Sequence, residues 1–194
     1  MAELLRHPDV RRKARSELAQ LIGPKRVVQE SDIDKLPYLQ AIIKETLRLH
    51  PAVPLLLPYK AKNDVELCGY YIAKDTQVLI NAWAIGRAPE YWVEPNCFKP
   101  ERFLLKPNVD YKGHDFEYIP FGAGRRICPG LPLAARMVHL ILGSILHSFD
   151  WKLPDGVSNE ELDMEEQFGV TLKKAVPLCA IPILDKDSTH TMYW

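Results

Sequence analysis

The chain of 194 residues lacks any paired cysteine motif: its four cysteines stand singly at positions 68, 97, 128 and 179. A structural zinc site needs closely spaced ligands, and a disulfide framework belongs to short secreted chains, so the spacing favours neither. The 25 basic and 25 acidic residues cancel to a net charge of zero. No overall field therefore indicates nucleic acid or acidic lipid as a partner.

Long apolar runs, a signal peptide and internal repeats are also missing. No run approaches the roughly 18 apolar residues of a membrane-spanning helix, so no segment is expected to cross a membrane. The absence of a secretory signal argues further against disulfides, and the absence of a repeat excludes a solenoid. The composition is 47% hydrophobic, which is enough for a core, and the 16 prolines predict many loops.

Apolar periodicity predicts several helices with short strands between them, and the length alone permits one or two small domains. A Gly-Pro pair ends the first clear helix, and Pro51 disfavours helix at the residue before it. Helices are expected over residues 10–22, from about 37 to about 50, and from 131 to about 149.

Other segments are expected to be strands or loops. Aromatic and β-branched residues predict short strands in the region 54–81. In detail, we expect strands at 70–72 and 77–81, a helical turn at 82–87, ordered loop over 88–127, a hairpin over 168–183 and a frayed tail over 185–194.

The most informative segment is residues 121–130, which read FGAGRRICPG. Gly122, Gly124 and Gly130 lack a Cβ, so the backbone can curl and approach a flat macrocycle closely. Cys128 lies just before a predicted helix, whose free N–H groups and dipole favour the thiolate form of a nearby sulfur. A thiolate can ligate haem iron, and Arg126 can pair with a haem propionate. The alternative is a structural cysteine in a tight turn.

Two further charged motifs accompany this loop. Glu45 and Arg48 share one helix face at a spacing of three residues. Taken alone, such a pair is most often an ordinary surface ion pair. Downstream, Arg102 lies in the segment Pro100-Glu101-Arg102-Phe103.

The residues of the cysteine loop carry a family resemblance. Phe121, Gly124, Arg126, Cys128 and Gly130 fill the five fixed positions of the cysteine-loop signature of the cytochrome P-450 (haem-thiolate monooxygenase) family. The chain resembles the C-terminal part of that family, and the motifs around residues 45 and 102 follow in the family's order. The resemblance implies the C-terminal part of the P-450 fold over residues 1–184, mainly α with small β-sheets and beginning after the family's long central helix.

The resemblance also assigns roles. Cys128 is implied to be the axial ligand of haem b, with Arg126, Phe121 and the loop glycines around the cofactor. Glu45, Arg48 and Arg102 are implied to form a buried structural triad that fixes the helix of Glu45 against the loop before the cysteine. Desolvation can offset the attraction within such a triad, so its expected contribution is to specificity of structure.

Other segments resemble plant terpene-alcohol hydroxylases similar to geraniol hydroxylase. The reaction implied is oxygen- and NADPH-dependent hydroxylation of a small hydrophobic plant metabolite. Segments that line the family's substrate pocket match two stretches of this chain, and simple core packing is the alternative for both. The implied pocket residues are Val53, Leu55, Leu56, Val170 and Thr171.

The resemblance implies partners and a location as well. Electrons are expected from an NADPH-dependent flavin reductase that docks near the Cys128 loop, with Arg125 and Arg136 among the nearby cations. Ordinary solvated charges are the alternative reading of those two arginines. Full-length relatives are expected on the cytosolic face of the endoplasmic reticulum membrane. For this chain, which carries no anchor, the cytosol or an undefined place is expected.

Several parts of the family pattern are missing. No Asp/Glu-Thr-Thr sequence occurs, and such an acid–threonine pair delivers protons in the family. Tyr59 stands after Pro58 where plant relatives usually have arginine. We therefore expect the chain alone to be inactive. The alternative is a non-catalytic truncated or degenerate product that binds haem weakly or not at all; a truncated gene model, a splice product or a degenerate gene would each account for it.

Overall fold

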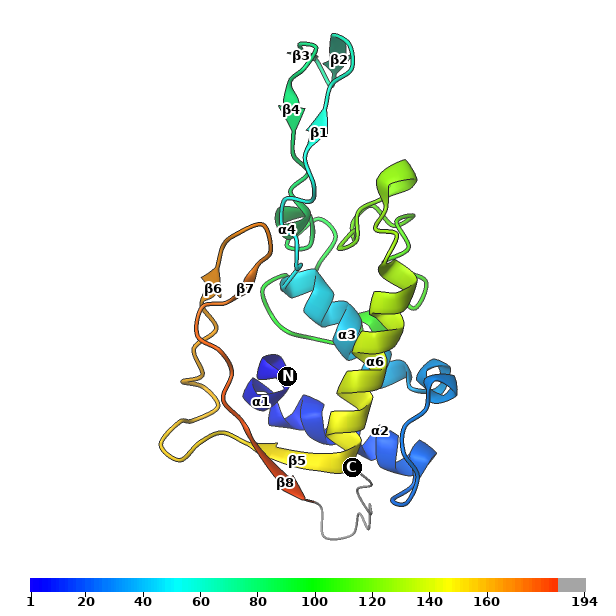
Figure 1. The fold of residues 1–194 in the computed structure, drawn as a ribbon, viewed down its shortest axis with the longest axis vertical. Coiled ribbons are helices and arrows are strands. Elements are labelled where there is room, and N and C mark those ends of the chain that lie inside the picture. The colour runs from blue at the N-terminus through cyan, green and yellow to red at the C-terminus, as the bar shows by residue number, and fades with distance from the viewer. Residues whose placement is uncertain (185–194) are drawn as a thin grey trace.

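The structure is a computed structural model that describes residues 1–184. Helices form its body, and four two-stranded antiparallel sheets lie around them (Figure 1), which confirms the predicted class of mainly α with small β-sheets. The helices are α1 (Ala2–Arg6), α2 (Pro8–Ile22), α3 (Pro37–Leu49), α4 (Ala82–Ile85), α5 (Glu101–Leu105) and α6 (Leu131–Ser148), with 3₁₀ helices η1 (Glu30–Lys35) and η2 (Gly124–Arg126).

Helix α3 is the centre of the fold, because α2, α5, α6 and η1 all contact it. It begins at Pro37, where a missing N–H is no loss. Its first free N–H groups, on Tyr38 and Leu39, donate to the two carboxylate oxygens of Glu17 from α2 at 2.8 and 2.9 Å. The helix ends just before Pro51, as predicted.

The buried side chains form two clusters. The larger one fills the space between α2, α3 and α6, and its fully buried members include Leu18, Leu39 and Leu146. The second is mainly aromatic and lies where α5 meets α3; its buried residues are Ala41, Trp92, Phe103, Val109 and Tyr118.

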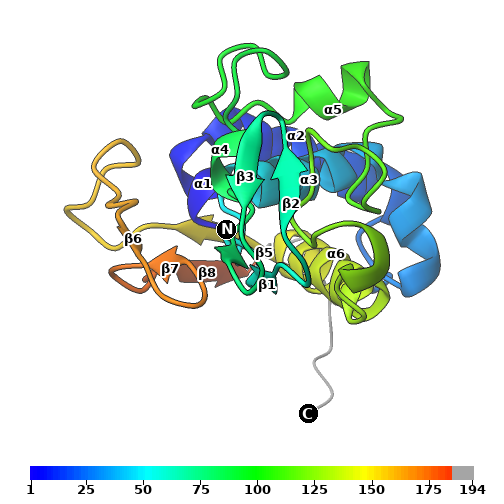
Figure 2. The same cartoon turned by 90° about the horizontal axis from the view of Figure 1, so that it is seen from above.

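A narrow β arm projects from the body, at the top of Figure 1 and toward the viewer in Figure 2. It consists of β1 (Tyr59–Lys60) paired with β4 (Gln77–Val78), and of β2 (Val65–Leu67) paired with β3 (Tyr70–Ile72). The predicted strand at 70–72 is confirmed. The strand predicted at 77–81 is too long, because Asn81 instead caps α4 by accepting a 2.9 Å hydrogen bond from the N–H of Ala84.

The hairpin predicted over residues 168–183 is wrong in its pairing. β6 (Glu166–Gln167) pairs with β7 (Lys173–Lys174), whereas β8 (Ile181–Leu184) pairs with β5 (Phe149–Lys152) at the end of α6. Strand propensity shows that a segment is extended but does not name its partner. The tail predicted over 185–194 lies outside the described residues.

The long loop predicted over residues 88–127 contains two short helices, α5 and η2. Phe103 of α5 is buried against Trp92 and Tyr118, so tertiary packing stabilises a helix too short to show a periodic pattern. The turn at 82–87 is confirmed as α4.

Helix α6 corrects the expectation that no segment is long and apolar enough to span a membrane. Its 18 residues have a mean hydropathy of 1.3, which meets that test by length and composition only. One side of the helix packs on α2, α3 and η1. The other side leaves Leu133, Met137, Val138 and Ile141 exposed.

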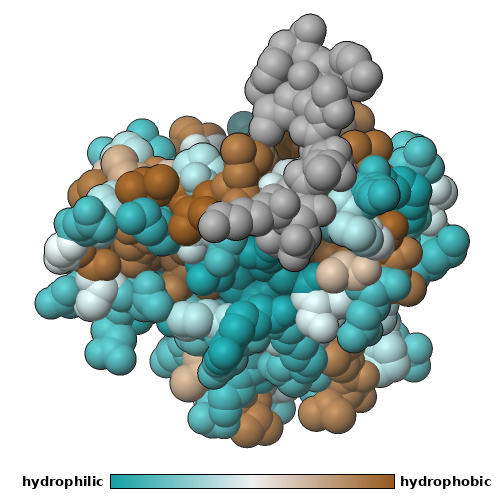
Figure 3. All heavy atoms as spheres, turned by 90° about the horizontal axis from the view of Figure 1, so that it is seen from below, coloured by the Kyte–Doolittle hydropathy of each residue, from teal (hydrophilic) through white to brown (hydrophobic). Residues whose placement is uncertain are grey.

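The end of the molecule away from the arm is mostly hydrophilic at its centre, with hydrophobic groups toward its edges (Figure 3). At this end, two arginines of α2 contact β5. Arg15 Nη1 lies 2.9 Å from Asp150 Oδ1, and Arg11 donates to the backbone oxygen of Trp151.

Candidate functional site

The cysteine loop folds back on itself immediately before α6. The N–H of Cys128 donates to the backbone oxygen of Phe121 at 2.9 Å, and the N–H of Ile127 donates to that of Gly124 at 3.1 Å. The backbone oxygen of Cys128 in turn accepts from the N–H of Leu131 at 3.2 Å. These bonds fix the cysteine at the start of the helix, where the sequence predicts it.

The backbone of the loop requires glycine at position 122 but not at position 130. Gly122 has φ of 75°, a conformation that disfavours other residues, so the turn itself requires glycine. Gly130 has an ordinary helical φ of −80°, so it is not needed for the curl. A Cβ at Gly130 would lie 3.7 Å from the sulfur of Cys128, which is ordinary van der Waals contact, so the space beside the thiol does not require glycine either.

An apolar hollow of about 320 Å³ opens beside the cysteine. Two parts of the chain that are far apart in the sequence build its walls: the end of α3 with the following residues 52–59, and the cysteine loop. The lining residues are Leu47, Ala52, Val53, Leu56, Leu57, Tyr59, Pro120, Phe121, Gly122, Arg126, Cys128 and Pro129. The volume lies in the range of small-molecule and cofactor sites.

Arg126 is the cation at this hollow. Its Nη1 donates to the backbone oxygen of Pro58 at 3.4 Å, and its guanidinium carbon lies 4.8 Å from the centre of the Tyr59 ring. Stacking of this kind orients the guanidinium plane while leaving most of its N–H groups free to bind an anion. Tyr59 thus supports Arg126 from the first strand of the β arm.

The structure brings together only part of the predicted site. Phe121, Gly122, Arg126 and Cys128 line the hollow with Val53 and Leu56. Gly124, Gly130 and Leu55 lie in the same segments without lining it. Val170 and Thr171 are exposed in the loop between β6 and β7. The N–H of Leu172 donates to the backbone oxygen of Ala52 at 2.8 Å, which holds that loop beside one wall.

The predicted triad is assembled as a network of ion pairs. Arg48 forms a fork on Glu45, with Nε–Oε2 and Nη2–Oε1 distances of 2.8 Å each. Arg102 Nε donates to Glu45 Oε1 at 3.0 Å. The side chains of Glu45 and Arg48 are fully buried, and that of Arg102 is 11% exposed.

Backbone groups complete the network. Arg48 Nη1 donates to the oxygens of Gly86 and Pro95 at 2.5 and 2.7 Å, and Arg102 Nη1 donates to the oxygen of Val93 at 2.8 Å. The N–H of Lys99 donates to Glu45 at 2.8 Å. Two irregular segments, at 86 and at 93–99, are therefore held by side chains of α3 and α5 in place of regular backbone pairing.

A row of aromatic rings connects the triad with the cysteine loop. Arg48 lies over Trp92, with its guanidinium carbon 5.3 Å from the ring centre. Trp92 then contacts Phe103 and Tyr118, and Tyr111 bridges Tyr118 and Phe121, with successive centroid distances of 5.1 to 6.5 Å. Burial raises the pKa of Tyr118 well above its ordinary value, so its hydroxyl stays protonated and donates to the oxygen of Lys44 at 2.8 Å.

The donor chemistry of the hollow can be tested against a haem group. Within residues 1–184 no set of three or more His, Cys, Asp or Glu side chains is placed to hold a metal ion. A porphyrin supplies its own four nitrogen ligands, so a single sulfur is enough for its iron. The lone Cys128, the apolar walls and the cation Arg126 therefore fit a flat, acid-bearing macrocycle better than a bare metal ion.

Comparison with known proteins decides the family. The model of the Cytochrome P450 family matches residues 1–179. The chain belongs to the cytochrome P450 family.

The similar cytochrome P450 proteins include plant enzymes. Over 183 residues the chain is 61% identical to Cytochrome P450 76C2 of Arabidopsis thaliana, covering 94% of this chain and 36% of that protein. It is 57% identical to Geraniol 8-hydroxylase of Catharanthus roseus, covering 94% of this chain and 37% of that protein. The resemblance to geraniol-hydroxylase-like members is thereby confirmed, over little more than a third of their length.

Solved cytochrome P450 structures agree with the fold. A zebrafish cytochrome P450 with progesterone matches with a TM-score of 0.82 and 33% identity, covering 95% of this chain and 40% of that chain. This likeness supports the assignment of the part of the P450 architecture that the sequence predicts.

Sequence reasoning missed several residues of the hollow in this cytochrome P450. Leu47 comes from the triad helix, Pro120 precedes the first signature position, and Pro129 lies between Cys128 and Gly130. Leu47 follows Glu45 by two residues, so it points away from the triad toward the other side of α3. That spacing was the one available signal; the contribution of Tyr59 depends on pairing in the β arm and could not be read from the sequence.

Proposed function

We propose that this chain is the haem-holding part of a cytochrome P450 monooxygenase, with Cys128 as the thiolate ligand of haem b. The observation that carries the proposal is the convergence of Cys128 and Arg126 on one apolar hollow beside the family's signature loop. Membership of the family supports the same cofactor.

Each residue has a distinct part in this proposal. When bound, haem supplies the redox chemistry by which such enzymes insert oxygen. Cys128 supplies the thiolate, and the hydrogen bond from its N–H to Phe121 fixes the loop that carries the sulfur. Arg126 neutralises a propionate, and its contact with Tyr59 limits the rotamers that must be ordered on binding. Apolar walls exclude water from the reacting face.

The triad of Glu45, Arg48 and Arg102 acts as a scaffold, distant from the reaction. It fixes the segments at 86 and 93–99. The row of packed aromatic rings extends from there to Phe121 and so restricts the position of the cysteine loop. Its role is to hold a loop of little regular secondary structure in one shape before the cofactor arrives.

We infer that the substrate of the whole protein is a small hydrophobic plant metabolite, with a terpene alcohol as the leading class. The similarity to Geraniol 8-hydroxylase supports this class. Val53 and Leu56 would contact it from the hollow wall, with Val170 and Thr171 beside them. An NADPH-dependent flavin reductase would supply electrons at the Cys128 loop, on the cytosolic face of the endoplasmic reticulum.

The test is addition of haem to the purified 194-residue chain, followed by reduction and carbon monoxide. We expect the red-shifted Soret band of a thiolate-ligated ferrous haem. Cys128→Ser should abolish that band, while the matched control Cys179→Ser should retain it. Retention of the band in Cys128→Ser, or its absence from the unmodified chain, would contradict the proposed site.

A second measurement separates the enzyme from its alternative, a product without catalytic activity. Haem, NADPH, a plant reductase and monoterpene alcohols are supplied, and products are detected by mass spectrometry. We expect no turnover by the chain alone, because residues 1–194 include no Asp/Glu-Thr-Thr sequence of the kind that delivers protons in the family. Reductase-dependent product above the Cys128→Ser control would overturn this expectation.

A further inference from the structure

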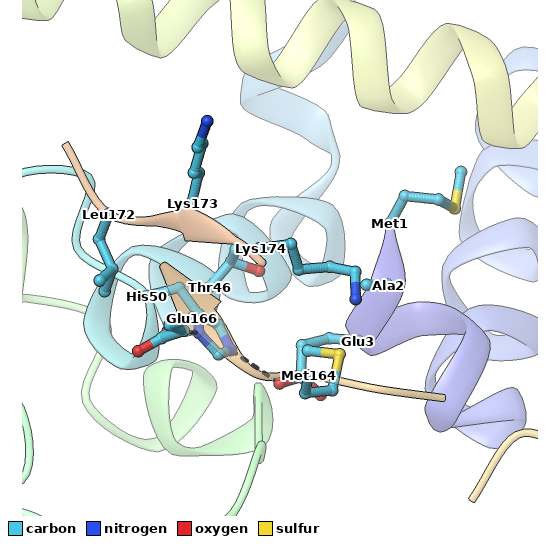
Figure 4. Close-up of a pocket in the computed structure, with 10 residues that line it drawn as sticks. All are labelled: Met1, Ala2, Glu3, Thr46, His50, Met164, Glu166, Leu172, Lys173 and Lys174. Carbon is cyan, nitrogen blue, oxygen red and sulfur yellow. Dashed lines mark hydrogen bonds and ion pairs between the residues drawn. The ribbon is translucent and has the colours of Figure 1, made fainter. Parts of the chain in front are cut away.

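A second charged cluster lies at the C-terminal end of α3, on the side shown in Figure 4. His50 stands between two carboxylates from distant parts of the chain. Its Nε2 lies 2.8 Å from Glu3 Oε1 of α1, and its Nδ1 lies 2.7 Å from Glu166 Oε1 of β6. The side chain of Glu3 is 9% exposed and that of His50 is 28% exposed.

This geometry fixes the protonation of the imidazole. An ionised carboxylate can only accept hydrogen bonds, so each ring nitrogen of His50 must carry a hydrogen. Two such acceptors therefore favour the imidazolium form of His50. Burial alone lowers the pKa of His50, but the hydrogen bonds to Glu3 and Glu166 outweigh it and raise that pKa above its ordinary value. Burial likewise acts to raise the pKa of Glu3, and the bond from His50 lowers it on balance.

Other charges face the cluster from the surrounding elements. At α1 and its two flanking residues these are the Met1 amino group, Arg6 and His7, whose Nδ1 lies 3.3 Å from Glu3 Oε2. Arg87, after α4, acts on Glu166 through space. On β7, Lys174 extends toward α1 and donates to the backbone oxygen of Asp163, whereas Lys173 points away from the imidazole (Figure 4).

The cluster determines where the loop between β6 and β7 lies. Glu166 is in the first strand of that hairpin, so its bond to His50 ties the hairpin to the end of α3. Two residues beyond His50, the backbone oxygen of Ala52 accepts from the N–H of Leu172 in the same loop. Ala52 and Val53 line the hollow beside Cys128. The hairpin itself is short, because its strands have two residues each.

We propose that His50 is a positioning residue: its imidazolium bridges Glu3 and Glu166 as a proton-controlled clasp that seats the β6–β7 loop beside the hollow. The further claim, that this loop then shapes the substrate side of the hollow, rests on the function proposed above. The clasp is strongest between the lowered pKa of Glu3 and the raised pKa of His50. As pH rises through the pKa of His50, one carboxylate loses its donor and the loop loosens.

The test uses the full chain without haem, so that its outcome is independent of the haem proposal. The pH titration of the His50 imidazole is followed by nuclear magnetic resonance. Hydrogen exchange of residues 165–174 is measured across the same pH range by mass spectrometry and corrected for intrinsic exchange. The variants are Glu166→Gln and His50→Gln, and the matched control is Glu165→Gln, the exposed neighbour.

In the unmodified chain, exchange of the loop should accelerate roughly tenfold as His50 deprotonates. Glu166→Gln should lower the pKa of His50 and give fast exchange even at low pH, whereas Glu165→Gln should behave like the unmodified chain. In His50→Gln the pH-dependent step should vanish. Two results would overturn the clasp even if haem binds through Cys128. One is a neutral His50 near pH 6, and the other is a hydrogen-exchange rate of the loop that does not change as His50 titrates.

Discussion

The Glu45 triad and the hollow beside Cys128 are joined by one row of aromatic rings, but they differ in how many partners their polar groups have. In the triad, buried charges meet each other and nearby backbone oxygens within 3.0 Å. In the hollow, Cys128 faces apolar walls, and the guanidinium of Arg126 makes one long hydrogen bond and a ring contact.

This difference indicates which part of the chain is complete in itself. The triad needs nothing further to be stable, and removal of one member would leave a buried charge unpaired. The hollow instead presents a cation, Arg126, and a soft sulfur donor, Cys128, which are the groups that the proposed haem would use. Substitutions should therefore affect folding at the triad and cofactor binding at the hollow.

The largest expected effect comes from Arg48→Ala. Loss of this guanidinium leaves Glu45 buried with fewer partners and frees the oxygens of Gly86 and Pro95. We expect a loss of about 3–5 kcal/mol in the free energy of unfolding, measured by urea denaturation. Arg102→Ala should act in the same direction, with reduced haem loading although Arg102 does not line the hollow.

Arg125→Ala is the matched control, because Arg125 is an exposed arginine of the cysteine loop. Its substitution should change the unfolding free energy by less than about 0.5 kcal/mol. If Arg48→Ala were as mild as this control, the triad would not be the scaffold described here.

The next effect in size is expected at Gly86, whose added Cβ would lie 2.6 Å from the backbone oxygen of Arg48. Gly86→Ala should cost about 1–3 kcal/mol in unfolding free energy, because neither backbone can move without disturbing the triad. Gly143→Ala offers the contrast: its Cβ would meet the flexible end of Leu39 at 3.2 Å. There the gain in helix propensity of ~1 kcal/mol should offset the crowding, and equal losses at both glycines would refute this reasoning.

The smallest effect on folding is expected at the hollow wall. Leu56 is partly exposed and has φ of 51°, a strained value for leucine that asparagine tolerates better. Leu56→Asn should change thermal stability by less than about 1 kcal/mol but weaken haem binding, measured by absorbance titration. Leu39→Ala in the closed core should instead cost about 2–5 kcal/mol. A large loss of stability in Leu56→Asn would make that wall part of the folding core.

How much could be predicted from the sequence depended on the range of the interactions. The helices around Glu45 and after Cys128 were readable, because periodicity and flanking prolines act locally. The partner of β8 and the helix at Phe103 were not, because packing across the fold decides them. At the site, signature residues located Cys128 and Arg126, whereas the support from Tyr59 depends on how the β arm leaves the body.

The ligand of the iron is the central claim, and electron paramagnetic resonance of the ferric, haem-loaded chain tests it most directly. The account predicts a low-spin spectrum of the thiolate type in the unmodified chain and in Arg125→Ala. In Cys128→Ser that spectrum should disappear while the fold is retained. A histidine-type spectrum in the unmodified chain, or a thiolate-type spectrum that survives in Cys128→Ser, would contradict it.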